Sequence, residues 1–353
     1  MDKILYISEK EQVKYNLLNM EYAVQSVQKM FDIMKNEDYI MAGKNKNSHG
    51  NYMYVTDKGN TDLYISMPAY LGGEYGCSGI KWHGPNRHIE GRKSETNYIL
   101  ILNDKKTGAP KAILPAGMLT TYRTAAVSAY ATMRLKKGIH TLGIIGPGKI
   151  NLAYTEWMIK HYPQIKVIKI KGRGKQKIYE FINSVKDIND AVQIEVSDQF
   201  EETVRDSDVI SINSGFEYES IIDMPYIREK WIKPGALLIC PSFIKFSDTF
   251  IAERSVLVAD NYKMYENYAE EMEFPLYNHL SILGNRFVDL VHEGKMPVDK
   301  VQNLVDIDQN KIESQMPILF ASGGMGIEDI AVGYDILQRA IKKEKEFNSK
   351  GFG

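Results

Sequence analysis

A glycine-rich turn, Gly146-Pro147-Gly148, lies between an apolar segment (141–145) and a segment of helical spacing that begins near Asn151. In dinucleotide-binding folds the first glycine permits a tight turn. The second lets the backbone approach the pyrophosphate, whose charge is stabilised by the N-terminus of the next helix. Asn151 replaces the third glycine of that pattern, and a purely structural strand–helix turn is the alternative. The flanking strand and helix favour a nicotinamide dinucleotide site. Its expected residues are Gly146, Pro147, Gly148, Lys149, Ile150 and Asn151.

The residues after the next predicted strand, 166–170, bear on the choice of dinucleotide. An Asp or Glu there would bind the ribose 2′-hydroxyl of NAD, but this sequence has Gly172 among cations. Arg173, with Lys171 or Lys175, matches a 2′-phosphate, and a solvated basic loop is the alternative. We therefore expect NADP(H) to be favoured, with NAD(H) possible, and Lys171 and Arg173 to be cofactor-binding residues.

Two further cations have apolar or small neighbours. Lys81 stands between Ile80 and Trp82 after a glycine-dense stretch, and Arg123 stands near the start of an Ala-rich segment, 119–135. A buried guanidinium requires an anionic partner, and a substrate carboxylate fits its fork. A lysine in an apolar environment has a lowered pKa, which suits it to proton transfer. The alternatives are an internal arginine–carboxylate pair and a surface lysine whose stem alone is buried.

The surrounding pattern predicts an α/β protein. A helix is expected over about 9–36, after a capping box at Ser8–Glu11, and another over 119–135. Strand, turn, helix and strand between 141 and 170 form a βαβ unit, which is typical of a parallel sheet. Further strands are expected at 209–212, 236–240 and, as the last, 256–259. The segment 262–316 reads as helical, and 328–347 as an amphipathic helix.

Composition limits the classes of function. The 353 residues carry 44 basic and 45 acidic side chains, a net charge of −1, so nothing favours a nucleic-acid or membrane-surface partner. Two cysteines, and seven histidines with no HxxxH or HxH spacing, suggest neither a disulfide framework nor a metal site. No signal peptide or membrane span is apparent, so a cytoplasmic protein is expected. The length favours two domains.

Several segments occur together in an order that resembles the ornithine cyclodeaminase/mu-crystallin family. They are Gly79-Ile80-Lys81-Trp82, the 119–128 segment with Arg-Thr-Ala-Ala, the glycine turn, and Ser322–Ala331. The resemblance implies a homodimer with a Rossmann-type parallel-sheet domain (125–324). Residues 1–124 together with 325–353 would form an α+β domain for substrate binding and dimerisation.

The same resemblance assigns roles to residues. Lys81 would handle the proton, and Arg123 would hold a carboxylate with help from Lys44. The turn of Ser322, Gly323 and Gly324 would approach the nicotinamide ring. The expected activity is NAD(P)-dependent oxidation or reduction at the Cα–N bond of an amino acid or N-carboxyalkyl amino acid, through an imine.

Alternatives within the family are ornithine cyclodeaminase, alanine dehydrogenase and ketimine reductase. Cyclodeaminases carry a glutamate where this chain has Ile65, and an aspartate in the loop after Pro-Gly-Ala, where residues 240–247 hold no carboxylate. Both differences argue against cyclisation of ornithine. A non-catalytic, NADP-loaded small-molecule binder is the alternative of another class.

Overall fold

The computed structural model describes residues 4–57, 60–84, 97–213, 224–308 and 315–349. The chain folds as two compact units, Met1–Arg123 with Met325–Gly353 and Thr124–Gly324. Helix α3 (Gly117–Leu135) contains the boundary between them. We refer to these as unit 1 and unit 2.

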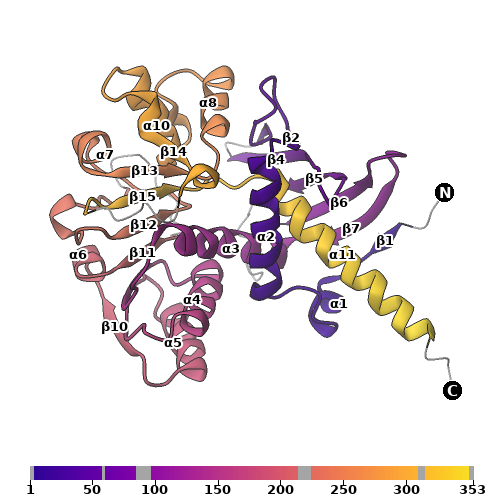
Figure 1. Cartoon of the computed structure of the whole chain (residues 1–353), viewed down its shortest axis with the longest axis horizontal. Helices are drawn as coiled ribbons and strands as arrows, with labels where there is room; N and C mark the ends of the chain where they lie inside the picture. The colour runs from indigo at the N-terminus through magenta and orange to yellow at the C-terminus, as the bar shows by residue number, and fades with distance from the viewer. Residues whose placement is uncertain (1–3, 58–59, 85–96, 214–223, 309–314, 350–353) are drawn as a thin grey trace. The chain divides into compact units, whose positions relative to one another are not determined.

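The strands described in unit 1 form one mixed sheet. Their order is β1 (Leu5–Tyr6), β7 (Pro110–Pro115), β6 (Tyr98–Asp104), β5 (Cys77–His83), β4 (Asn60–Leu71) and β2 (Tyr39–Met41), with β3 (Asn51–Asp57) also paired to β4. Neighbours are antiparallel except for β1 and β7. The helices α2 (Met20–Lys35) and α11 (Gly326–Ser349) pack on each other, and α11 lies on β4, β5 and β6 (Figure 1).

Two glycines allow α11 to approach this sheet closely. A β-carbon on Gly79 of β5 would lie 2.4 Å from the carbonyl oxygen of Ile101 and 2.6 Å from Cδ1 of Ile330. One on Gly333 of α11 would lie 2.2 Å from Cδ2 of Leu100. The absence of both side chains sets the distance between β5 and the first turns of α11.

The prediction of one helix over 9–36 is wrong. The capping box at Ser8 is present and begins α1 (Glu9–Lys14), but the helix ends there. Asn16 adopts a left-handed conformation, with φ of 48°, and Asn19 caps α2 by accepting a hydrogen bond from the Tyr22 N–H. Asparagine is tolerated both in the left-handed conformation and as an N-cap. The break therefore needs no glycine or proline, and the apolar spacing continues across it.

The strands described in unit 2 form an all-parallel sheet, which confirms the predicted Rossmann-type fold class. Their order is β10 (Gln193–Ser197), β9 (Val167–Lys171), β8 (Thr141–Ile145), β11 (Val209–Ile212), β12 (Leu237–Cys240), β15 (Ile318–Ala321), β13 (Val256–Ala259) and β14 (Val301–Asn303). The expectation that 256–259 is the last strand is wrong, because β14 and β15 follow it. The segment 262–316 is correspondingly not helical throughout.

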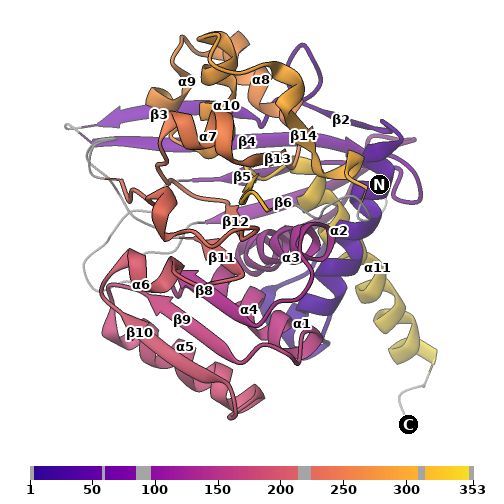
Figure 2. The ribbon, with the colours of Figure 1, turned by 60° about the vertical axis from the view of Figure 1, so that its left-hand side comes forward.

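Helices cover both faces of this sheet. Helices α4 (Lys149–His161) and α5 (Lys175–Ile188) lie on one side in Figure 1, and α6 (Phe200–Val204) and α7 (Asp248–Arg254) on the other. Figure 2 shows β9 and β10 between α5 and α6. The remaining helices are α8 (Tyr262–Glu271), α9 (Leu276–His279), α10 (Leu283–His292) and the short 3-10 turns Glu229–Trp231, Val298–Lys300 and Leu304–Asp306.

Candidate functional site

Lys81 and Asp329 form a buried ion pair in unit 1. The Nζ atom of Lys81 lies 2.7 Å from Oδ2 of Asp329, and the two side chains are 2% and 0% exposed. Lys81 projects from β5 and Asp329 from the first turn of α11, which packs on that strand. Burial and the charge of Arg123 lower the pKa of Lys81 to about 8, although Asp329 opposes the shift. This lysine can therefore exchange a proton near neutral pH.

Arg123 belongs to the same cluster. Its Nη1 lies 2.8 Å from Oε2 of Glu328, and its Nε lies 3.2 Å from Oδ1 of Asp329. Burial opposes the charged form, but the two carboxylates outweigh it and raise the pKa of Arg123. Of the two possibilities that the sequence left open, the internal arginine–carboxylate pair is thus present. Two cations face two carboxylates, so the charges of this group of four side chains balance.

His49 lies close to these charges and was not singled out from the sequence. It stands in the segment between β2 and β3, and a hydrogen bond of 2.8 Å joins its Nδ1 to the Tyr52 hydroxyl. Burial, with the nearby charges of Lys81 and Arg123, lowers the pKa of His49 to about 3. The imidazole is therefore neutral at physiological pH. Lys44, by contrast, is exposed, and the structure does not bring it into the buried cluster.

The glycine turn of unit 2 connects β8 to α4. Gly146 is left-handed, with φ of 86°, and donates to the Lys171 carbonyl at 2.9 Å, which ties the turn to β9. Gly148 is the N-cap of α4, yet a β-carbon there would have no protein atom within 4 Å. Protein packing therefore does not require glycine at 148, and the open space fits the close approach of a ligand. Lys149 and Ile150 lie in the first turn of α4, whose N–H groups suit a pyrophosphate.

Asn151 stands where the third glycine was expected, and its side chain points into the protein. Its Nδ2 donates to the carbonyls of Gly146 (2.8 Å) and Ile145 (3.1 Å), and its Oδ1 accepts from the Ser211 hydroxyl (2.6 Å). Asn151 and Ser211 are 1% and 2% exposed. The carboxamide thus holds the turn to the ends of β8 and β11. Asn151 positions the turn together with Ser211, a residue that no sequence pattern marks.

The turn of Ser322, Gly323 and Gly324 follows β15 and is held by Asp260, which follows the neighbouring strand β13. One carboxylate oxygen of Asp260 accepts from the N–H groups of Gly323 (2.8 Å) and Gly324 (3.4 Å). The other accepts from the Tyr265 hydroxyl (2.9 Å) and the Asn261 N–H (2.8 Å). Burial raises the pKa of the Asp260 carboxyl, and these donors oppose that shift. Asp260 is a site residue that was not predicted, although its place directly after a predicted strand is a signal in the sequence, because ligands of parallel sheets bind at the carboxyl ends of the strands.

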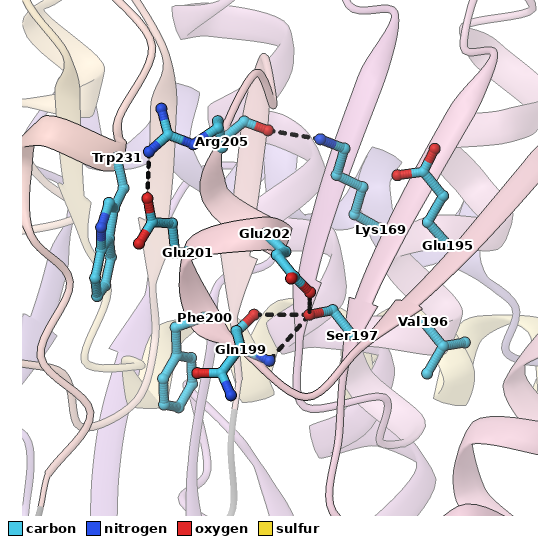
Figure 3. Close-up of a pocket in the computed structure, with 10 residues that line it drawn as sticks. All are labelled: Lys169, Glu195, Val196, Ser197, Gln199, Phe200, Glu201, Glu202, Arg205 and Trp231. Atoms are coloured by element: carbon cyan, nitrogen blue, oxygen red, sulfur yellow. Dashed lines mark hydrogen bonds and ion pairs between the residues drawn. The ribbon is translucent and has the colours of Figure 1, made fainter.

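A cavity of about 650 Å³ lies elsewhere on unit 2, over β9, β10 and α6 (Figure 3). Its polar groups pair with one another: Ser197 donates to Glu202, Arg205 pairs with Glu201, and Lys169 donates to the Arg205 carbonyl. No residue of the glycine turn lines it, so we do not assign the cofactor to this cavity. Among the described residues, no group of His, Cys, Asp and Glu could hold a metal ion. No described helix is long and apolar enough to span a membrane.

The all-parallel sheet with its glycine turn, together with a separate mixed-sheet unit, defines a two-unit protein of Rossmann type. The sequence pattern of the ornithine cyclodeaminase/mu-crystallin family matches residues 17–344, so the chain belongs to this family. A relative is the N-((2S)-2-amino-2-carboxyethyl)-L-glutamate dehydrogenase of Staphylococcus aureus. It is 26% identical over 284 residues, which cover 79% of each chain.

Solved structures share the fold. The Δ1-pyrroline-2-carboxylate reductase of Thermococcus litoralis, in complex with NADH and L-proline, gives a TM-score of 0.74 at 20% identity, over 97% of this chain and 98% of the other. An archaeal alanine dehydrogenase dimer with bound NAD gives 0.73 at 20% identity, over 97% of each chain.

Proposed function

We propose that the chain is an NAD(P)-dependent oxidoreductase that acts on the Cα–N bond of an amino acid or N-carboxyalkyl amino acid through an imine. The observation that carries this proposal is the buried Lys81, with a pKa of about 8 and with Asp329 and Arg123 beside it. The dinucleotide would supply the hydride acceptor or donor. Membership of a family with dehydrogenases and reductases among its relatives supports this activity.

The charge balance of the cluster bears on the substrate. Lys81 would move the proton on nitrogen or water, with Asp329 as its charge partner. Arg123 would bind a substrate carboxylate, with Lys44 contacting a carboxylate from its exposed position. Because the carboxylates of Glu328 and Asp329 already balance the two cations, a zwitterionic amino acid or a protonated imino acid adds no net charge. A simple carboxylate would leave an uncompensated negative charge, and the additional carboxylate of an N-carboxyalkyl amino acid would need the charge of Lys44.

For the cofactor we propose the glycine turn 146–151, with Lys171 and Arg173, and the turn 322–324 near the nicotinamide. The similar solved structures contain NAD or NADH. For this chain we propose NADP(H), because Arg173 is exposed beside Gly172 and no carboxylate follows β9 directly. We also propose a homodimer, which the dimeric state of the similar alanine dehydrogenase supports. Unit 1 would serve substrate binding and dimerisation.

Ornithine cyclodeaminase is the less supported family activity. Ile65 is buried and apolar, at 7% exposed, where a glutamate would be needed. The first carboxylate after β12, Asp248, accepts from both Nε and Nη2 of Arg286 and so is engaged within the protein. Alanine dehydrogenase and ketimine reductase activities remain within the proposed class.

The test is the variant Lys81→Ala, compared with Lys111→Ala. Lys111 is a lysine of the same sheet that pairs with Asp104 at the surface. We expect Lys81→Ala to bind NADP+ or NAD+ as the wild type does but to lose oxidation of the amino acid, whereas Lys111→Ala keeps both. A screen of amino acids and N-carboxyalkyl amino acids, followed by nicotinamide absorbance, supplies the substrate. Unchanged turnover in Lys81→Ala would overturn the proposed role.

A second candidate is a non-catalytic, NADP-loaded binding protein. It is favoured by one observation, that the side chains of Lys81 and Arg123 are already paired with Asp329 and Glu328. Absence of cofactor turnover across the whole panel of amino and keto acids, with dinucleotide binding retained, would select this candidate.

A further inference from the structure

Gly172, the first residue after β9, has no room for a side chain. A β-carbon there would lie 2.8 Å from both Cγ and Cδ of Pro147 and 3.0 Å from Cγ1 of Ile178. The backbone of Gly172 is not left-handed, so its conformation does not itself require glycine. The ring of Pro147, which is the middle residue of the glycine turn, makes the two shortest of these contacts and is therefore the main obstacle to a side chain, with Ile178 of α5 the lesser one.

The turn cannot easily move away to make room. The Gly146 N–H is bonded to the carbonyl of Lys171, directly before Gly172, and the Gly146 carbonyl is held by Asn151. Pro147 itself is buried, and its ring is rigid. An added side chain at 172 must therefore displace the glycine turn, which hydrogen bonds hold to Lys171 and to Asn151.

Position 172 is where a carboxylate would bind the ribose 2′-hydroxyl of NAD. We infer that the packing of Pro147 against Gly172 determines dinucleotide choice, because it bars a ribose-binding carboxylate and leaves Arg173 and Lys171 to meet a 2′-phosphate. This inference rests on the proposed dinucleotide site. Discrimination between NADP+ and NAD+ thus has two parts: the exclusion of a ribose-binding acid at 172, and the attraction of the 2′-phosphate by Arg173 and Lys171.

Isothermal titration of NADP+ and NAD+ into the full chain, without substrate, tests the steric part. We expect the wild type to bind NADP+ more tightly, and Gly172→Asp to weaken both dinucleotides about tenfold by displacing the turn. In Pro147→Ala/Gly172→Asp the ring is gone, so NAD+ binding should recover while NADP+ binding stays weak, and the preference inverts. Pro147→Ala alone should keep the preference for NADP+. If Gly172→Asp binds NAD+ as tightly as the double variant, Pro147 excludes nothing and the inference is overturned.

Arg173→Ala tests the attractive part without disturbing the packing. It should weaken NADP+ about tenfold and leave NAD+ within about twofold. Lys166→Ala, which removes an exposed cation at the opposite end of β9, should change neither. Equal losses for the two dinucleotides in Arg173→Ala would contradict recognition of a 2′-phosphate. Failure of the wild type to bind either dinucleotide would contradict the proposed function instead.

Discussion

Asp329 contacts both cations of the buried cluster through different oxygen atoms: Oδ2 lies 2.7 Å from Lys81 Nζ, and Oδ1 lies 3.2 Å from Arg123 Nε. The carboxylate therefore couples the two residues to which we assign proton transfer and carboxylate binding. It also opposes the effects of burial and of Arg123 on Lys81, since both lower the lysine pKa and Asp329 raises it. The protonation of Lys81 thus depends on Asp329.

This dependence predicts a pH profile. Oxidation of an amino acid requires an unprotonated Lys81, so kcat/KM should rise with pH through about 8 and then level. Reduction of the imine requires the protonated lysine, so its rate should fall over the same range. In Asp329→Asn the charge that raises the lysine pKa is lost, and the midpoint should move down by about one unit or more.

Asp335→Asn is the control for that profile. Asp335 lies on the same helix and accepts hydrogen bonds from Ser26 and Tyr75 rather than from a cation. We expect it to reduce stability without moving the midpoint. A midpoint that stays the same or rises in Asp329→Asn would show that Lys81 is not the titrating group.

The sequence predicted those parts of the molecule whose signal is local. The strand 141–145, the glycine turn and the helix after it are adjacent in the chain, so their pattern was sufficient for the fold class. The sequence does not reveal the break between α1 and α2, because asparagine is also found within helices and the apolar spacing continues across Asn16 and Asn19.

The buried cluster depends on contacts between distant segments. Lys81 and Arg123 were identified from their apolar neighbours, but Glu328 and Asp329 become their partners only when α11 packs on β5. The sequence does contain one indication of these partners, since Glu328 and Asp329 are two acids among the otherwise apolar residues 326–331 at the start of a helix. The role of Asn151 is likewise hidden in the sequence, where it only departs from the glycine pattern, because its bond to Ser211 requires that β8 and β11 be neighbours in the sheet.

Loss of the Asn151 side chain should affect cofactor binding as well as stability. Asn151→Ala removes the side-chain donor to the carbonyls of Ile145 and Gly146 and takes away the acceptor of the buried Ser211 hydroxyl, which costs about 1–3 kcal/mol of unfolding free energy. Because the turn also loses its link to Ser211, dinucleotide affinity should fall about tenfold. Isothermal titration and thermal unfolding measure the two effects separately.

Asn285→Ala is matched to this variant. Asn285 is another buried asparagine of unit 2. It lies on α10, away from the glycine turn, and its amide donates to the carbonyl of Leu280 at the end of α9. It should lower stability comparably and leave dinucleotide affinity unchanged. Equal affinity in Asn151→Ala and the wild type would limit Asn151 to a stabilising role.

The Asp260 carboxylate should affect turnover more than cofactor binding. In Asp260→Asn an amide nitrogen must face either the Gly323 and Gly324 N–H groups or the Tyr265 and Asn261 donors. When the amide nitrogen faces the two glycine N–H groups, donor meets donor and the 322–324 turn is displaced, at a cost of about 1–3 kcal/mol. If that turn positions the nicotinamide, as proposed, kcat should fall about tenfold or more, because small misplacements of reacting groups slow transfer strongly. The dinucleotide dissociation constant should change little, since the 146–151 turn is intact.

The comparison that separates positioning from stability is Asp289→Asn. Asp289 is also buried in unit 2, and it accepts two backbone N–H groups, those of Leu276 and Tyr277 at the start of α9, where Asp260 accepts three. Both variants should lose similar stability, measured by urea unfolding, but only Asp260→Asn should lose kcat at a temperature where each is folded. Similar kcat values in the two variants would mean that Asp260 only supports the fold. Two buried carboxylates that each accept backbone N–H groups would then be equivalent for turnover.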